Sequence, residues 1–132
     1  MASYTKAHID EVATDKWPGW IPIRHHFGIE TFGINAYRRN AGEGLVPEHD
    51  ETGGGAPELY YVATGHAAFS VGGDEIDAPA GTCLWVTDAS ARRAATAKSD
   101  DTVVLAIGAA KPGEAYSPAG WESRYLEGES QH

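Results

Sequence analysis

Short apolar runs, interrupted by glycine, proline and aspartate, dominate this chain, and helical periodicity is scarce. The runs end at turn signals such as NAGEG, VGGDE, APAG and KPGE. This pattern predicts strands at 31–38, 59–64, 66–71, 82–87, 92–97 and 102–108. Many short strands at close spacing indicate an all-β, antiparallel sandwich or barrel.

The domain organisation follows from length and turns. A chain of 132 residues suits a single domain. We expect an N-terminal arm at 1–30, a barrel over 31–110 and a C-terminal extension, 111–132, that packs on the barrel. The sequence GGD at 72–74 predicts a tight hairpin. Three glycines at 53–55 predict either a lid or a plain loop.

Charge and composition narrow the class of partner. Ten Lys and Arg against nineteen Asp and Glu give a net charge of −9, which argues against nucleic acid and anionic membranes as partners. Cys83 is the sole cysteine, so it cannot form an internal disulfide. The first residues, MASYTKAHIDEVATDK, are too polar for a signal peptide, and no apolar run reaches the roughly 20 residues of a membrane helix. We therefore expect a cytoplasmic protein with a small-molecule ligand.

One stretch, residues 44–65, gathers a histidine and several carboxylates around the three glycines. On an extended strand His49 and Glu51 point to the same face, because successive side chains alternate. Glu58 begins the next run, where it shares a face with Tyr60. Such a group holds a metal, supplies acid and base groups, or only braces the fold.

The spacing of this stretch resembles the first motif of the cupins, double-stranded β-helix barrels of the jelly-roll type. That motif reads Gly, five residues, His-x-His, three or four residues, Glu, six residues, Gly. Glu58, six residues and Gly65 match it in full. His49 lies at the first histidine and Glu51 replaces the second, while Gly42 precedes His49 by seven positions instead of six.

The second cupin motif reads Gly, five residues, Pro-x-Gly, two residues, His, three residues, Asn. Its spacing fits from Gly81 to Thr96, although the motif residues between them are substituted, and Arg92 falls at the histidine position. The resemblance spans roughly residues 31–108 and implies an antiparallel cupin barrel. It further implies that four catalytic residues converge at the barrel mouth: His49, Glu51, Glu58 and Arg92. Arg93 takes the inward place if Arg92 points outward.

A typical cupin holds iron, manganese, nickel or zinc with three histidines and a glutamate. Here two carboxylates about 5 Å apart repel by roughly 3 kcal/mol at an effective dielectric of about 20, so either a positive charge lies among them or one of them takes a proton. Arg92 supplies one, and its guanidinium about 5 Å from a divalent ion is repelled by roughly 6 to 7 kcal/mol. A site without a metal or other cofactor is favoured; the alternative is a divalent ion held by His49, Glu51 and Glu58.

Further side chains are candidates for a ligand pocket. Asn35 and Tyr37 alternate with apolar residues, so both line the interior if the polar set faces inward. Tyr60 and Trp85 add aromatic surface, either as core or as ligand-binding side chains.

Because cupins host many chemistries, the resemblance does not fix the activity. The residues favour an isomerase, epimerase or lyase acting on a small anionic or carbonyl-bearing molecule. A glutamate would be the base, His49 the acid or base, and Arg92 a clamp. The alternatives are a ligand-binding or sensing protein without turnover, and a metal-dependent, dioxygenase-like enzyme. We also expect a homodimer, since exposed Trp17 and Trp20 in the arm would otherwise form an apolar patch.

Overall fold

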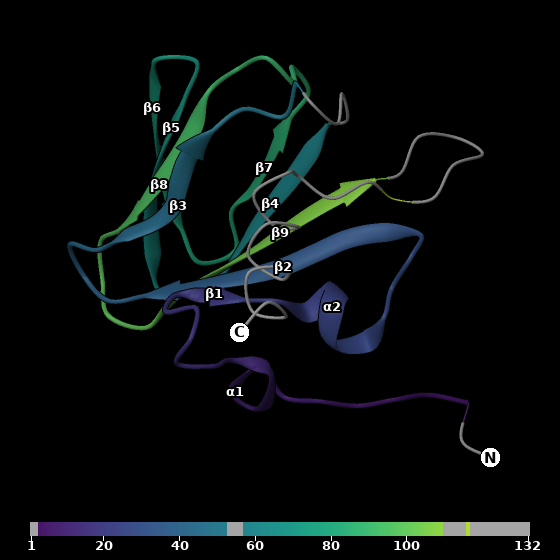
Figure 1. The fold of residues 1–132 in the computed structure, drawn as a ribbon. Helices are drawn as coiled ribbons and strands as arrows, with labels where there is room; N and C mark the ends of the chain where they lie inside the picture. Colours follow the sequence, from purple (N-terminus) through teal and green to yellow (C-terminus); the bar gives the residue numbers. More distant parts are fainter. Residues whose placement is uncertain (1–2, 53–56, 110–115, 117–132) are drawn as a thin grey trace.

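The computed structural model describes residues 3–52, 57–109 and 116, which form two β-sheets facing one another (Figure 1). The five-stranded sheet runs in the order β1 (Trp20–Ile21), β2 (Phe32–Arg39), β9 (Thr102–Ala109), β4 (Glu58–Thr64) and β7 (Cys83–Val86). The four-stranded sheet runs in the order β3 (Gly44–His49), β8 (Arg93–Ala97), β5 (His66–Val71) and β6 (Asp74–Pro79). Two short helices, α1 (Ile9–Val12) and α2 (Ile23–Phe27), lie in the N-terminal segment.

All strand pairs within the two sheets are antiparallel, which confirms the all-β, jelly-roll prediction. The two sheets do not join into a closed cylinder. Every predicted strand overlaps a strand of the structure, whereas β1, β3, β6 and both helices were not predicted. The GGD hairpin is confirmed: Val71 pairs with Asp74, and Gly72 and Gly73 have positive φ angles of 57° and 91°.

The main core lies between the two sheets. Alternation along β4 and β8 sends Tyr60, Val62 and Ala95 inward, where Phe69 of β5 lies with its ring centroid 5.2 Å from that of Tyr60. Each large apolar side chain buried in this way contributes about 1.5–3 kcal/mol of transfer free energy. Arg93 also points inward, because it lies two residues before Ala95 on β8. A charged side chain therefore lies at the edge of an apolar core.

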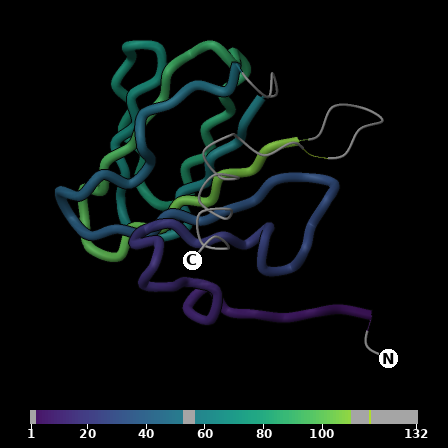
Figure 2. Tube along the Cα trace, in the orientation of Figure 1, coloured from purple at the N-terminus to yellow at the C-terminus, as the bar shows by residue number. Residues whose placement is uncertain are grey.

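The N-terminal arm covers the outer face of the five-stranded sheet. Val12 and Ile21 pack there against Ala36 of β2 and Val103 of β9. Figure 2 shows the arm in purple running along β2. The argument for a homodimer assumed exposed arm tryptophans, but Trp20 is only 6% exposed within one chain, so the homodimer stays a prediction.

Two predictions fall outside the described residues. One concerns the three glycines at 53–55, and the other concerns the C-terminal extension, of which the structure describes only Tyr116. Tyr116 donates its backbone N–H to the carbonyl of Glu30 at 2.8 Å, and its ring lies 5.5 Å from the Arg24 guanidinium. None of the helices in the described part of the chain is long and apolar enough to cross a membrane.

Candidate functional site

Three side chains of the cupin-like motif meet at one end of the space between the sheets. His49 ends β3, Glu51 lies two residues beyond it, and Glu58 begins β4. The Nε2 atom of His49 lies 3.0 Å from Glu51 Oε1 and 3.8 Å from Glu58 Oε1. The Nδ1 atom of His49 lies 2.8 Å from the Pro47 carbonyl, which fixes the plane of the ring. The strand ends therefore bring an imidazole and two carboxylates into direct contact.

Glu58 has further donors on the same carboxylate oxygen. The Tyr60 hydroxyl donates a hydrogen bond to Glu58 Oε1, and Arg93 Nη1 lies 3.2 Å from that atom. The Arg93 side chain has no solvent exposure, and it also donates to the carbonyls of Asp88 at 3.0 Å and Ala91 at 2.9 Å. Arg93 is thus a buried cation that donates its hydrogen bonds to Glu58 and to the loop before β8.

The structure corrects the predicted position of Arg92. Its side chain is 59% exposed and pairs with Glu48 at 3.1 Å and Asp50 at 3.7 Å, outside the group around His49. Side chains of β8 alternate, and Arg93, Ala95 and Ala97 occupy the inward positions. Arg92 therefore belongs to the outward set, and neither arginine is available as a clamp for a ligand.

The loop before β8 is linked to both glutamates of the group, to Glu51 through its backbone and to Glu58 through Arg93. The Glu51 N–H donates to the Ala89 carbonyl at 2.8 Å, and Arg93 holds the carbonyls on either side of Ala89. Arg93 thereby contacts Glu58 directly and supports the backbone of Glu51 through the loop.

The charges of the group balance one another. Burial lowers the pKa of His49, but hydrogen bonds to Glu51 and Glu58 outweigh this effect and raise its pKa to about 10. Burial raises the pKa of Glu58, yet the hydrogen bonds from His49 and Tyr60 hold it below its usual range. Burial and the charge of Glu58 raise the pKa of Tyr60, so its hydroxyl stays a donor. The group thus pairs two acidic side chains, Glu51 and Glu58, with two basic ones, His49 and Arg93.

Two cavities border this group. The smaller one, about 20 Å³ in volume, is lined by His49, Glu51, Glu58 and Asn35 and has room for about one water molecule. The larger one, about 620 Å³, lies between the arm and β3, and we call it the arm cleft. His49 and Tyr37 line both cavities. Of these two cavities, only the arm cleft has room for the body of a ligand, and His49 is the member of the group that lines it.

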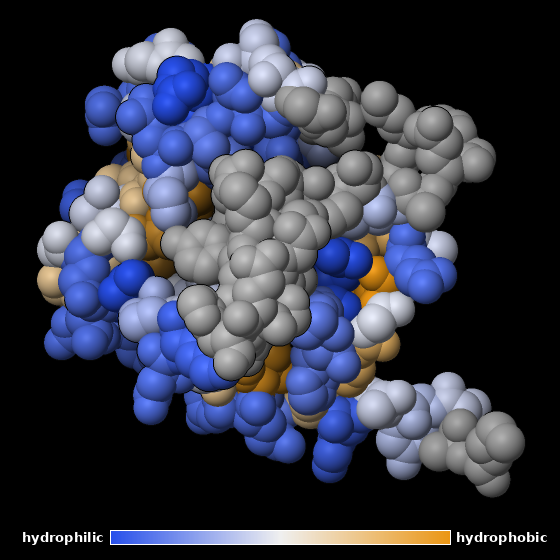
Figure 3. All heavy atoms as spheres, viewed as in Figure 1, coloured by the Kyte–Doolittle hydropathy of each residue, from blue (hydrophilic) through white to orange (hydrophobic). Residues whose placement is uncertain are grey.

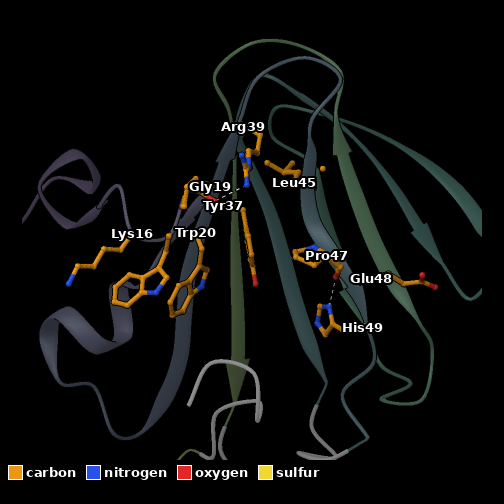
Figure 4. Close-up of a pocket in the computed structure, with 12 residues that line it drawn as sticks. Lys16, Gly19, Trp20, Tyr37, Arg39, Leu45, Pro47, Glu48 and His49 are labelled. Atoms are coloured by element: carbon orange, nitrogen blue, oxygen red, sulfur yellow. Dashed lines mark hydrogen bonds between the residues drawn. The ribbon is translucent and has the colours of Figure 1, made fainter. Parts of the chain in front are cut away.

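Figure 4 shows the arm cleft with Lys16 and Trp20 on one wall and Pro47 and His49 on the other. In the view of Figure 3, apolar surface lies recessed between the polar surroundings of β3 and the β1–β2 region. Sequence reasoning assigned the arm tryptophans to a dimer interface and missed this cleft. The pairing of Trp20 with Tyr37 brings the arm to β2, and the aromatic WPGW sequence was the only local signal.

The predicted ligand-binding residues divide into two groups. Asn35 and Tyr37 face the interior, as expected if the polar set points inward, and Tyr37 lines the arm cleft. Tyr60 is buried and contacts Glu58, so it acts on the group through that carboxylate. Leu84 and Val86 take the inward positions of β7, which leaves Trp85 pointing outward and 57% exposed, so its ligand-binding role stays a prediction.

The three side chains offer atoms of the type that bind divalent ions, but the positive charges of His49 and Arg93 oppose an ion at this place. His49, Glu51 and Glu58 each offer one ligand atom, and these atoms lie within 4.8 Å of one another. An ion must displace the proton of His49, whose pKa of about 10 makes this cost roughly 4 kcal/mol at pH 7. The buried Arg93 beside Glu58 adds electrostatic repulsion. The residues present therefore suit a proton on His49 better than an ion.

Comparisons with known proteins identify the fold. No family profile and no curated protein matches the chain. A cupin protein from Bacteroides fragilis is 18% identical, with a TM-score of 0.64 over 86% of this chain and 89% of that one. An RmlC-like cupin from Desulfovibrio desulfuricans is 26% identical, with a TM-score of 0.52 over 61% of this chain and 73% of that one.

A sugar phosphate isomerase of the cupin superfamily from Silicibacter pomeroyi is 19% identical, with a TM-score of 0.57 over 76% of this chain and 67% of that one. These likenesses agree with the two facing antiparallel sheets and with the motif spacing around Glu58 and Gly65. The protein therefore has the fold of the cupins.

Proposed function

We propose that the protein is an enzyme that moves a proton on a small carbonyl-bearing molecule, as an isomerase, epimerase or lyase does, without a metal. The observation that carries this proposal is the contact of one imidazole and two carboxylates at the end of a cleft of about 620 Å³. A base and an acid within hydrogen-bond distance of each other, reached from a cleft, are the groups that such a reaction requires.

The two carboxylates have different roles in this proposal. Glu58 accepts hydrogen bonds from Tyr60 and Arg93, which leaves it poorly placed to take a further proton. Glu51, with 17% of its side chain exposed, removes the proton from the carbon beside the substrate carbonyl. His49 donates its proton to the carbonyl oxygen, and an enol or enediol forms. Return of the proton from Glu51 to either carbon, and of the hydroxyl proton to His49, completes the exchange without an added oxidant.

Proton exchange with solvent tests this proposal. We expect the protein in D₂O with EDTA to exchange a C–H proton in at least one member of a panel of 2-hydroxy acids, 2-oxo acids and sugar phosphates, followed by proton NMR. Loss of the base in Glu51→Gln should slow the exchange by about 100-fold or more. Glu75→Gln is the matched control, because Glu75 is exposed on β6 and lines neither the arm cleft nor the smaller cavity. No exchange with any member of the panel would refute the proposal and leave a ligand-binding role.

A metal-dependent activity is the second candidate, favoured by the three ligand atoms within 4.8 Å. His49, Glu51 and Glu58 would hold the ion, which supplies Lewis-acid or redox chemistry when bound. The measurement is calorimetric titration with zinc or manganese at pH 7. Stoichiometric binding in the micromolar range, with activity that EDTA abolishes and the ion restores, would support this candidate over the metal-free one.

A further inference from the structure

The walls of the arm cleft are mainly apolar. Six of its lining side chains are aromatic or aliphatic and come from both the arm and the barrel: Trp17, Pro18, Trp20, Tyr37, Leu45 and Pro47. The rings of Trp17 and Trp20 meet edge to face, with centroids 5.4 Å apart, so they are held as one unit. Such walls stabilise a flat, apolar body and offer few partners for the hydroxyls of a sugar.

Basic side chains outnumber acidic ones in the lining of the arm cleft, although the whole protein carries a net charge of −9. Arg39 and Lys16 line it, and Glu48 is the only carboxylate among the residues that the structure describes as lining it. The charge of Glu48 is offset by Arg92 at 3.1 Å. Arg39 donates to the Pro18 carbonyl at 2.8 Å, which positions its guanidinium, and its Nη1 forms a longer ion pair with Glu43 at 3.8 Å.

The cation and the reactive group lie at opposite ends of the arm cleft. Arg39 ends β2 next to Gly44 and Leu45, whereas His49 lies at the other end of β3 (Figure 4). The four residue steps from Leu45 to His49 span at most about 13 Å at the rise of an extended strand. A ligand that touches both ends is therefore elongated, about 10 Å long.

We propose that the arm cleft binds an elongated carboxylic acid with an aromatic or similarly apolar ring, whose carboxylate lies at Arg39 and whose ring lies against Trp17 and Trp20. The end of the molecule opposite the carboxylate then reaches the small cavity beside Glu51. The catalytic part of this assignment rests on the proposed function, whereas the binding part does not.

Binding of simple probes tests the assignment. We expect 4-phenylbutanoate to bind to the wild-type protein about tenfold or more tightly than its neutral amide, 4-phenylbutanamide, since a charged hydrogen bond is worth about 1.5–3 kcal/mol. Calorimetry and quenching of tryptophan fluorescence measure both affinities. Glucose 6-phosphate serves as a polar anion of similar length and should bind more weakly than the aryl acid.

Two adjacent arginines give a matched pair of variants. Arg39→Gln removes the cation of the arm cleft and should abolish the preference for acid over amide. Arg38→Gln makes the same change on the same strand, but Arg38 pairs with Asp10 of the arm outside the cleft, so the preference should persist. Trp17→Ala should weaken acid and amide alike.

Several results would overturn the assignment: no binding of the aryl acid, equal affinity for acid and amide, tighter binding of glucose 6-phosphate, or equal effects of Arg38→Gln and Arg39→Gln. These outcomes are independent of turnover. A protein that binds the acid with the expected preference but exchanges no proton supports this assignment and refutes the proposed function. Exchange on a sugar phosphate without binding of the acid does the reverse.

Discussion

Replacing Arg93 by methionine tests the architecture of the site most directly. The guanidinium has no solvent exposure, lies 3.2 Å from Glu58 Oε1 and donates to two carbonyls of the preceding loop. Methionine keeps most of the volume but leaves the Glu58 carboxylate, 15% exposed, without its buried cation. Breaking a buried ion pair from one side costs about 3–5 kcal/mol. A loss of this size is a large part of the roughly 5–15 kcal/mol that stabilises a domain.

The neighbouring residue provides the control. Arg92→Met removes an arginine that is 59% exposed and should change stability by less than about 1 kcal/mol. Urea unfolding followed by tryptophan fluorescence gives both values. Arg93→Met combined with Glu58→Gln should recover part of the loss, because the unpaired charge is then gone. Equal costs for Arg92→Met and Arg93→Met would refute the reasoning.

Three further predictions concern other parts of the chain. Folding raises the pKa of His49 from 6.5 to about 10. The stability that protonated His49 contributes is therefore fully present below pH 6.5 and is lost as the pH rises from 6.5 to about 10. The urea midpoint of unfolding should fall more steeply over this pH range in the wild-type protein than in His49→Gln. Gly65→Ala should cost over about 3 kcal/mol, and Gly42→Ala only about 1–2, because both glycines have positive φ but only the new Cβ at 65 would meet the Thr102 Cα, at 2.7 Å. Trp85→Ser should lower the free energy of unfolding by less than about 1 kcal/mol in the same assay, since Trp85 is exposed; a cost above about 2 kcal/mol would contradict its outward position.

The strands that the sequence predicted are those with clear apolar runs. β3 and β6 escaped prediction because half of each faces solvent or the polar site. In β6, Asp74, Glu75 and Asp77 are exposed and Ala78 is its buried residue. The sequence of such a polar edge strand resembles that of a loop, and β6 is extended because it pairs with β5.

The arm cleft was beyond prediction for a different reason. Its walls come from residues 16–20 and 44–49, which are distant in sequence and meet only because Trp20 pairs with Tyr37. The aromatic WPGW sequence signalled that the arm buries apolar surface, but not against which surface. From the sequence alone, the apolar surface of the arm could be buried equally well against a second copy of the chain or against the barrel of the same chain.

The position of the buried cation was not predictable from motif spacing, but the requirement for a cation was predictable from electrostatics. The cupin frame counted from Gly81 to Arg92 through a loop, and spacing within a loop does not fix which side chain of the following strand points inward. A shift of one residue exchanges the two faces of a strand, and Arg93 takes the inward place while Arg92 pairs with Glu48. The electrostatic argument was independent of this count: carboxylates packed beside His49 require positive charge nearby, and Arg93 supplies it at 3.2 Å from Glu58. The need for a cation was therefore predictable from composition, whereas its identity depended on the conformation of the loop from Asp88 to Ala91.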